Sequence, residues 1–148
     1  MIFSALMMSG ALIAQDTPVA PLEPLRQVFV SPQAVGYIGE PRPLGDGRIQ
    51  AWGWVFLKDT QSDGTTNGLT MLNEVDCGAN VSRVVVYGKY FHTMHMGDVA
   101  GETTSSARQT GTPPASMLTG ACNYARLQSP LLPGPEAARD AADQHFGR

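Results

Sequence analysis

The residues of this chain that could do covalent chemistry are its two cysteines, Cys77 and Cys122. They stand far apart in the sequence and no Cys-x-x-Cys pair occurs, so a redox-active dithiol is not expected. Together with the apolar start of the chain, they suggest an exported domain held by one disulfide. The alternative is two buried free thiols in a cytosolic protein.

A second group of residues could ligate copper, because His and Met are soft ligands. It consists of His92, Met94, His95 and Met96. On a strand His92 and His95 would point to opposite faces, and no Asp, Glu or Cys stands at ligand spacing. We therefore predict no metal site, and we interpret both methionines as apolar residues that fill gaps in the core.

Catalytic patterns are missing from the sequence. No serine stands in a Gly-x-Ser-x-Gly elbow, and the acidic residues are scattered over predicted loops and strand ends. The glycines of Gly45-Asp46-Gly47 have neither the spacing nor the lysine of a phosphate-binding loop. The sequence therefore predicts a protein without enzymatic activity and without a cofactor.

Length and charge restrict the class of protein further. The chain has 148 residues, enough for one domain with a modest core, and its net charge is only -3. No basic cluster occurs, so nucleic acid is not an expected partner.

The start of the chain resembles the apolar core of a secretory signal. Residues 1–14 carry no charge and are too few to span a bilayer, which takes roughly 20 apolar residues. We predict a signal peptide over residues 1–15, with Ala14 before the cleavage site. No Lys or Arg precedes the apolar run, so two alternatives stay open: a true start further upstream, or an apolar first element of the fold.

A three-strand meander is the clearest structural pattern in the sequence. Residues 48–58 alternate as a strand that is apolar on both faces, so something must cover each face. A polar, glycine-containing loop follows, and residues 69–77 and 81–92 form the next two strands.

The flanking segments complete an α+β, mainly β, fold. Residues 25–30 and 37–40 are predicted strands, residues 97–114 a loop, and residues 115–127 either helix or strand. We expect one twisted antiparallel sheet domain over residues 25–127. Residues 128–148 form a Pro-rich linker and a short helical tail that either docks or frays.

Aromatic residues offer a candidate binding face. Trp52 lies on one side of the first meander strand, and Tyr87 or Tyr90 on a neighbouring strand joins it there. Trp54 and Phe56 share that side, but for them we favour the core.

The order of several short motifs resembles the proteobacterial surface-adhesin protein E family. Gly47 with Ile49 and Trp52 is similar to its turn and central strand. The remaining matches are Tyr37-Ile38, Asp76-Cys77, Arg83, Tyr87, Pro114, Ser116 and Cys122. They cover residues 25–122. The acidic residue expected after Tyr37-Ile38 is displaced to Glu40, and a tryptophan expected before Pro114 is absent.

This resemblance implies a small exported domain with an antiparallel sheet and a helix, and it supports the disulfide. It also implies a non-catalytic binding protein in the periplasm or on the outer cell surface, with a protein or extracellular-matrix-type ligand. The alternatives are an envelope structural subunit that pairs with itself as a homo-oligomer, or an enzyme of unrecognised type.

Overall fold

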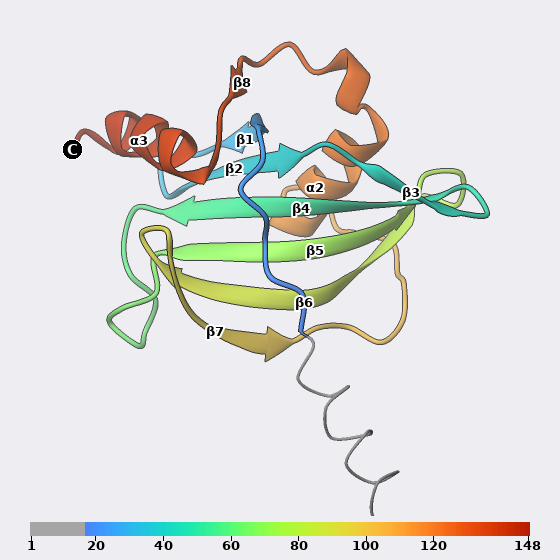
Figure 1. Cartoon of the computed structure of the whole chain (residues 1–148), viewed down its shortest axis with the longest axis horizontal. Helices are drawn as coiled ribbons and strands as arrows, with labels where there is room; N and C mark the ends of the chain where they lie inside the picture. The colour runs from blue at the N-terminus through green and yellow to red at the C-terminus, as the bar shows by residue number, and fades with distance from the viewer. Residues whose placement is uncertain (1–16) are drawn as a thin grey trace, which may run out of the picture.

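One antiparallel sheet forms the body of the protein in the computed structural model, which describes residues 17–148 (Figure 1). The predicted signal peptide, residues 1–15, lies outside the described residues. The strands follow one another across the sheet in the order β7-β6-β5-β4-β2-β1-β8, and β3 pairs with β4 beside β2. They are β1 (Leu25–Val30), β2 (Ala34–Gly39), β3 (Arg42–Gly45), β4 (Arg48–Leu57), β5 (Gly68–Asp76), β6 (Val81–Phe91), β7 (Met94–Ala100) and β8 (Leu131–Leu132).

Three helical segments follow the meander. Helix α2 (Pro113–Cys122) begins after Thr112, whose side chain accepts a hydrogen bond from the N–H of Ala115. A short 3-10 helix, η1 (Tyr124–Arg126), comes next, and α3 (Pro135–Phe146) lies near the end of the chain. The predicted α+β fold, its meander and its C-terminal helix are thus confirmed.

The segment after the meander differs from the prediction. Part of the expected loop over residues 97–114 belongs to β7, which forms a hairpin with β6. His92 turns the chain there with a positive φ of 56°. Met94 and Met96 are 58% and 48% exposed on this edge strand, so their prediction as core residues was wrong. The strand was missed because β7 is short, contains Gly97 and is exposed along almost its whole length, so its sequence does not alternate between an apolar and a polar face.

Strand β4 is covered on both faces, as its sequence requires. Every residue from Ala51 to Phe56 is buried. Ala51 and Val55 belong to a core cluster with α2, whereas Trp54 and Phe56 belong to a cluster with α3. The two faces of the sheet are therefore named the α2 face and the α3 face.

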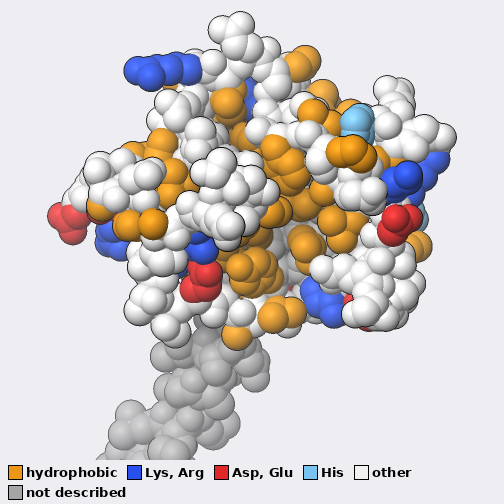
Figure 2. Space-filling model, turned by 180° about the vertical axis from the view of Figure 1, so that it is seen from behind, with side chains coloured by type: hydrophobic (Ala, Val, Ile, Leu, Met, Phe, Trp, Pro, Cys, Tyr) orange, Lys and Arg blue, Asp and Glu red, His pale blue; other side chains and the backbone are white. Residues whose placement is uncertain are grey.

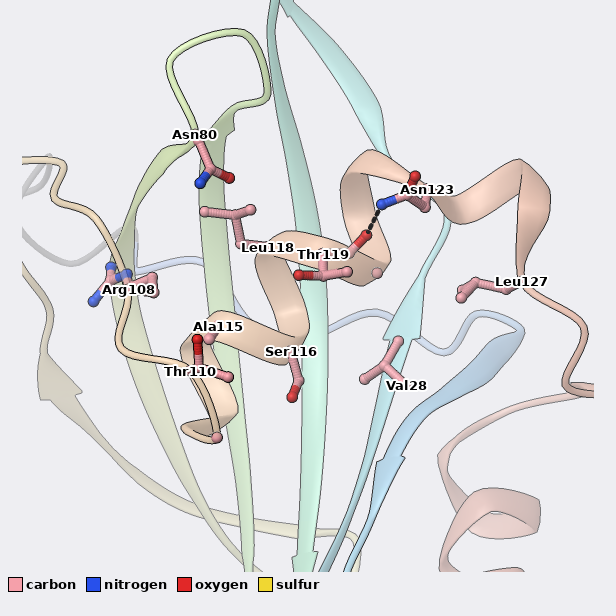
Figure 3. Close-up of a pocket in the computed structure, with 12 residues that line it drawn as sticks. Val28, Asn80, Arg108, Thr110, Ala115, Ser116, Leu118, Thr119, Asn123 and Leu127 are labelled. Carbon is pink, nitrogen blue, oxygen red and sulfur yellow. Dashed lines mark hydrogen bonds between the residues drawn. The ribbon is translucent and has the colours of Figure 1, made fainter.

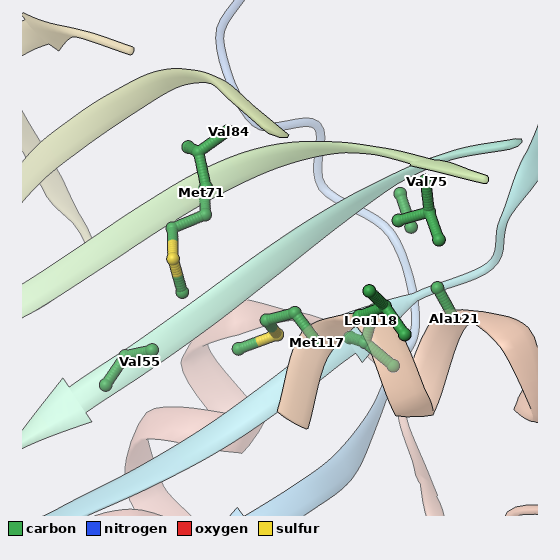
Figure 4. Close-up of a cluster of buried hydrophobic side chains, with 9 residues drawn as sticks. Val55, Met71, Val75, Val84, Met117, Leu118 and Ala121 are labelled. Atoms are coloured by element: carbon green, nitrogen blue, oxygen red, sulfur yellow. The ribbon is translucent and has the colours of Figure 1, made fainter. Parts of the chain in front are cut away.

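On the α2 face, the helix packs closely against the sheet (Figure 4). Met117 is fully buried, and a Cβ built at Gly53 would lie only 2.5 Å from its sulfur. Gly53 thus leaves the room that Met117 fills, and a larger residue would push α2 away from β4.

On the α3 face, the chain before β1 crosses the sheet as an extended segment (Figure 1). We call residues 17–24 the strap. Ala20 packs beside Trp52, Leu72 and Val86, and α3 buries Ala138 and Ala142 against the same face. The helical tail predicted at residues 128–148 therefore docks, because its small apolar stripe contacts the aromatic residues of the sheet.

The predicted disulfide is confirmed. Cys77 follows β5 and bonds to Cys122 at the end of α2, with their Cα atoms 5.7 Å apart. The bond closes a loop with a sequence separation of 45 residues, and the described residues contain no free cysteine.

Removing this bond as Cys77→Ala/Cys122→Ala is expected to lower the free energy of unfolding by about 2–4 kcal/mol, because the unfolded chain regains the entropy of the closed loop. Urea unfolding of the variant and of the oxidised and reduced wild type measures this. Equal midpoints for oxidised and reduced wild type would contradict the prediction.

A half-buried clasp, formed by Glu102, Arg108 and Ser82, holds the segment after β7 against β6. Glu102 accepts hydrogen bonds from the N–H of Val84 at 2.7 Å and from Arg108 at 2.9 Å. Arg108 also donates to the backbone and hydroxyl oxygens of Ser82. The hydrogen bonds from Arg108 lower the pKa of Glu102 below its ordinary value.

The clasp makes part of the stability depend on pH. Because the pKa of Glu102 is lowered in the folded protein, its contribution is full above the ordinary value of 4.5 and is lost as pH falls through the lowered folded value. We expect Glu102→Gln to reduce the loss of stability on acidification, and Arg108→Met to cost about 2 kcal/mol at neutral pH. Denaturant unfolding between pH 7 and pH 3 measures both, and Asp59→Asn, which removes an exposed carboxylate outside the clasp, is the control.

Candidate functional site

The structure divides the predicted binding face between two sides of the sheet. Trp52 and Tyr90 lie on the α3 face, whereas Tyr87 packs with the core cluster of the α2 face. Tyr87 and Tyr90 are three residues apart, so strand alternation points them to opposite faces. A β-bulge at Val85, between the partners of Leu72 and Asn73, decides which of the two shares the face of Trp52. The three aromatic residues therefore do not form one surface.

Two of the three predicted residues are also buried. Trp52 is 5% exposed beneath the strap, and Tyr90 is 4% exposed. Trp54 and Phe56 are buried as well, as we predicted for them. Burial raises the pKa of the Tyr90 hydroxyl, and nearby Asp98 raises it further.

Tyr87 is half-buried on the α2 face, which Figure 2 shows from behind. Hydrophobic side chains gather across the middle of this face. Leu57 and Leu69 are two further half-buried residues beside the core there. Helix α2 thus leaves part of this face partly accessible.

The α3 face has a cavity of about 770 Å³ between the strap and the start of α3. We call it the aromatic cleft, because its lining includes Trp54 and Tyr90. The strap, the β6–β7 turn and the start of α3 supply the other residues: Val19, Ala20, Leu22, Thr93, His95, Pro133, Gly134, Pro135, Glu136, Ala137 and Asp140. Its size is in the range of small-molecule and peptide-side-chain sites.

The aromatic residues of the cleft belong to a row of packed rings. The centroids of Trp54 and Tyr90 are 4.5 Å apart, and Tyr90 lies 5.1 Å from the ring of His95. On the other side Trp54 stacks on Phe56 at 5.5 Å. The indole N–H of Trp54 is buried and has no acceptor in the described part of the chain. Packing on both sides makes these rings rigid.

The charged groups nearest the cleft are carboxylates. Glu136 and Asp140 are exposed on α3, and neither forms an ion pair with a described residue. The Nε2 atom of His95 lies 2.8 Å from a carboxylate oxygen of Asp98. No Lys or Arg lines this cleft. The electrostatic potential at the cleft is therefore expected to favour a positively charged group.

The wall formed by α3 is held by a buried arginine. Arg139 is 5% exposed, pairs with Asp143 at 3.1 Å and donates to the side-chain oxygen of Asn67 at 3.3 Å. The same oxygen accepts the backbone N–H of His92. Burial and the charge of Arg139 lower the pKa of His92. One arginine thus connects α3 to the loop before β5 and to the β6–β7 turn.

A second hollow, of about 410 Å³, lies along the outer side of α2 (Figure 3). Its lining combines polar residues with Val28, Leu118 and Leu127, and the side chains of Arg108 and Asn123 already form hydrogen bonds. Arg108 is held by the clasp, and Asn123 donates to the carbonyl oxygen of Thr119 at 2.9 Å. This hollow is therefore a weaker candidate than the aromatic cleft.

The metal ligands considered in the sequence are not brought together. His92 packs on Phe91, whereas His95 contacts Tyr90 and Asp98. Within residues 17–148, no group of three or more His, Cys, Asp or Glu side chains is placed to hold a metal ion.

None of the helices over residues 17–148 has the length and hydropathy of a membrane-spanning segment. Comparisons of the chain with protein-family models, with curated proteins and with solved structures find no match. The resemblance to the surface-adhesin protein E family therefore stays a prediction.

Sequence reasoning missed most of the cleft. It had placed Trp54 in the core, and it assigned no role to Leu22, Glu136 or Asp140. The acidic residues have a helical spacing of four, which puts them on one side of α3, but nothing in the sequence shows that this side adjoins Trp54.

Replacing Arg139 is expected to loosen the α3 wall. Arg139→Ala leaves the buried oxygen of Asn67 without this donor and should cost about 1–3 kcal/mol. Hydrogen exchange of residues 135–146 should accelerate while that of β4 and β5 stays slow. The exposed Arg126→Ala is the matched control, and equal exchange of α3 in both variants would contradict the role of Arg139.

Proposed function

We propose that this chain is a non-catalytic binding protein, exported to the periplasm or outer cell surface, which captures a protein ligand in the aromatic cleft. The observation that carries the proposal is the cleft itself, with its rigid aromatic lining and exposed apolar rim. Leu22 is 90% exposed and Val19 is 55% exposed at that rim. Exposed apolar residues around a cavity are typical of a surface that contacts another protein.

The resemblance to the surface-adhesin protein E family implies the adhesin-like role, with an unknown protein or an extracellular-matrix-type molecule as the ligand. The disulfide supports export, because such bonds persist in oxidising compartments.

One argument for the alternative function, a self-associating envelope subunit, no longer applies. It was based on the two apolar faces of residues 48–58, and both faces are covered within the chain by α2, the strap and α3. Light scattering of the oxidised protein decides it, since a strict monomer excludes self-pairing. An enzyme of unrecognised type is the least favoured candidate.

The cleft proposal predicts that Leu22→Ser reduces capture by immobilised basement-membrane matrix at least fivefold, because an exposed apolar contact is lost at the rim. Surface plasmon resonance measures the capture, with an albumin-coated surface as the blank. Leu44→Ser is the matched control, since Leu44 is also an exposed leucine but does not line the cleft. Wild-type capture by Leu22→Ser, or no capture by the wild type, would overturn the proposal.

A further inference from the structure

We infer that the aromatic cleft binds an arginine or lysine side chain in an extended segment of the partner protein. The inference rests on the proposed function, and it specifies the chemistry of the ligand. It is carried by the combination of an aromatic lining with carboxylates that have no ion-pair partner in the described part of the chain.

The aromatic lining favours a cation with an apolar stem. Trp54 and Tyr90 are only 3% and 4% exposed, and their rings pack on each other, on Phe56 and on His95. A ligand in the cleft therefore meets the edges of these rings, which suit the methylene stem of a lysine or arginine, and its charge would lie at the carboxylates of α3. Trp54 and Tyr90 both line the cleft, and their packing against Phe56 and His95 fixes their positions. The cleft would therefore receive the charged group without rearranging its walls.

The charges of the cleft select the sign of the ligand. Glu136 and Asp140 stand one helical turn apart on α3, and both are exposed beside the cavity. Two like charges at this spacing repel each other, and a cation between them would relieve that repulsion. The remaining ionisable side chains of the lining are His95, which faces Asp98, and Tyr90, whose hydroxyl has a raised pKa.

The start of α3 also lines the cleft, and a helix N-terminus can bind an anion. Two features oppose this here. Pro135 has no N–H to donate, and the carboxylate of Glu136 already stands in the first turn. The lining therefore favours a cation over a phosphate or carboxylate.

A polypeptide fits the cleft better than a free organic cation does. The cavity of about 770 Å³ has room for one long side chain and its neighbours in the chain. A peptide also supplies carbonyl oxygens, and the buried N–H of Trp54 beside the cavity has no acceptor in the described part of the protein. Val19 and Leu22 at the rim would contact the apolar residues that flank the basic one.

Calorimetry with two matched peptides tests this inference. The first is acetyl-Ala-Leu-Arg-Leu-Ala-amide, and the second carries citrulline, which keeps the shape of arginine without its charge. We expect the arginine peptide to bind the oxidised protein at least tenfold more tightly at low salt, and the difference to shrink as salt is added. The indole N–H signal of Trp54 in the NMR spectrum should shift on binding.

The double variant Glu136→Gln/Asp140→Asn should bind the arginine peptide at least tenfold more weakly than the wild type does. Its affinity for the citrulline peptide should be unchanged. The control Glu40→Gln/Asp46→Asn makes the same change in net charge at exposed residues outside the cleft. It should bind like the wild type.

Several outcomes would overturn the inference: equal affinities for the two peptides, no binding of either, or the same loss in the control variant. The matrix assay with Leu22→Ser is independent of these results. If matrix capture depends on Leu22 but the protein does not prefer the arginine peptide, the inference of a basic side chain is wrong and the proposed function still stands.

Discussion

Strand β4 carries hydrophobic side chains on both faces, and the rest of the structure depends on covering each of them. A strand of this kind cannot stand at the surface, because either face would expose a continuous apolar strip to water. Helix α2 covers one face through Met117, and α3 with the strap covers the other. The layers of the protein follow from this requirement.

The two layers that cover β4 are attached to the sheet in different ways. A covalent bond from Cys77 to Cys122 holds α2 at the end of β5, so that layer is fixed wherever the disulfide is intact. The α3 layer has no such bond and relies on small apolar residues and on buried Arg139. The layer without a covalent attachment is also the one that forms a wall of the cleft.

The predicted binding face shows where sequence reasoning reached its limit. Alternation along β4 correctly placed Trp52, Trp54 and Phe56 on one face. In β6, Tyr87 and Tyr90 are three residues apart, so regular alternation already puts them on opposite faces. Which of them shares a face with Trp52 could not be read from the sequence, because the extra residue Val85 puts Val84 and Val86 on opposite faces and so reverses the alternation that follows. Bulges of this kind leave no reliable signal in a single sequence, since they depend on the register with the neighbouring strand.

The sequence by itself determined the meander, the two-sided burial of β4, the C-terminal helix and the pair of cysteines that would bond. Each of these follows from local patterns of polarity or from a small number of possible partners. Only the tertiary structure decided what covers each face and that Leu22, Trp54 and Asp140, far apart in the chain, line one cavity. The physical reason is that the docking of α3 and the strap depends on the shape of the assembled sheet, which no single segment encodes.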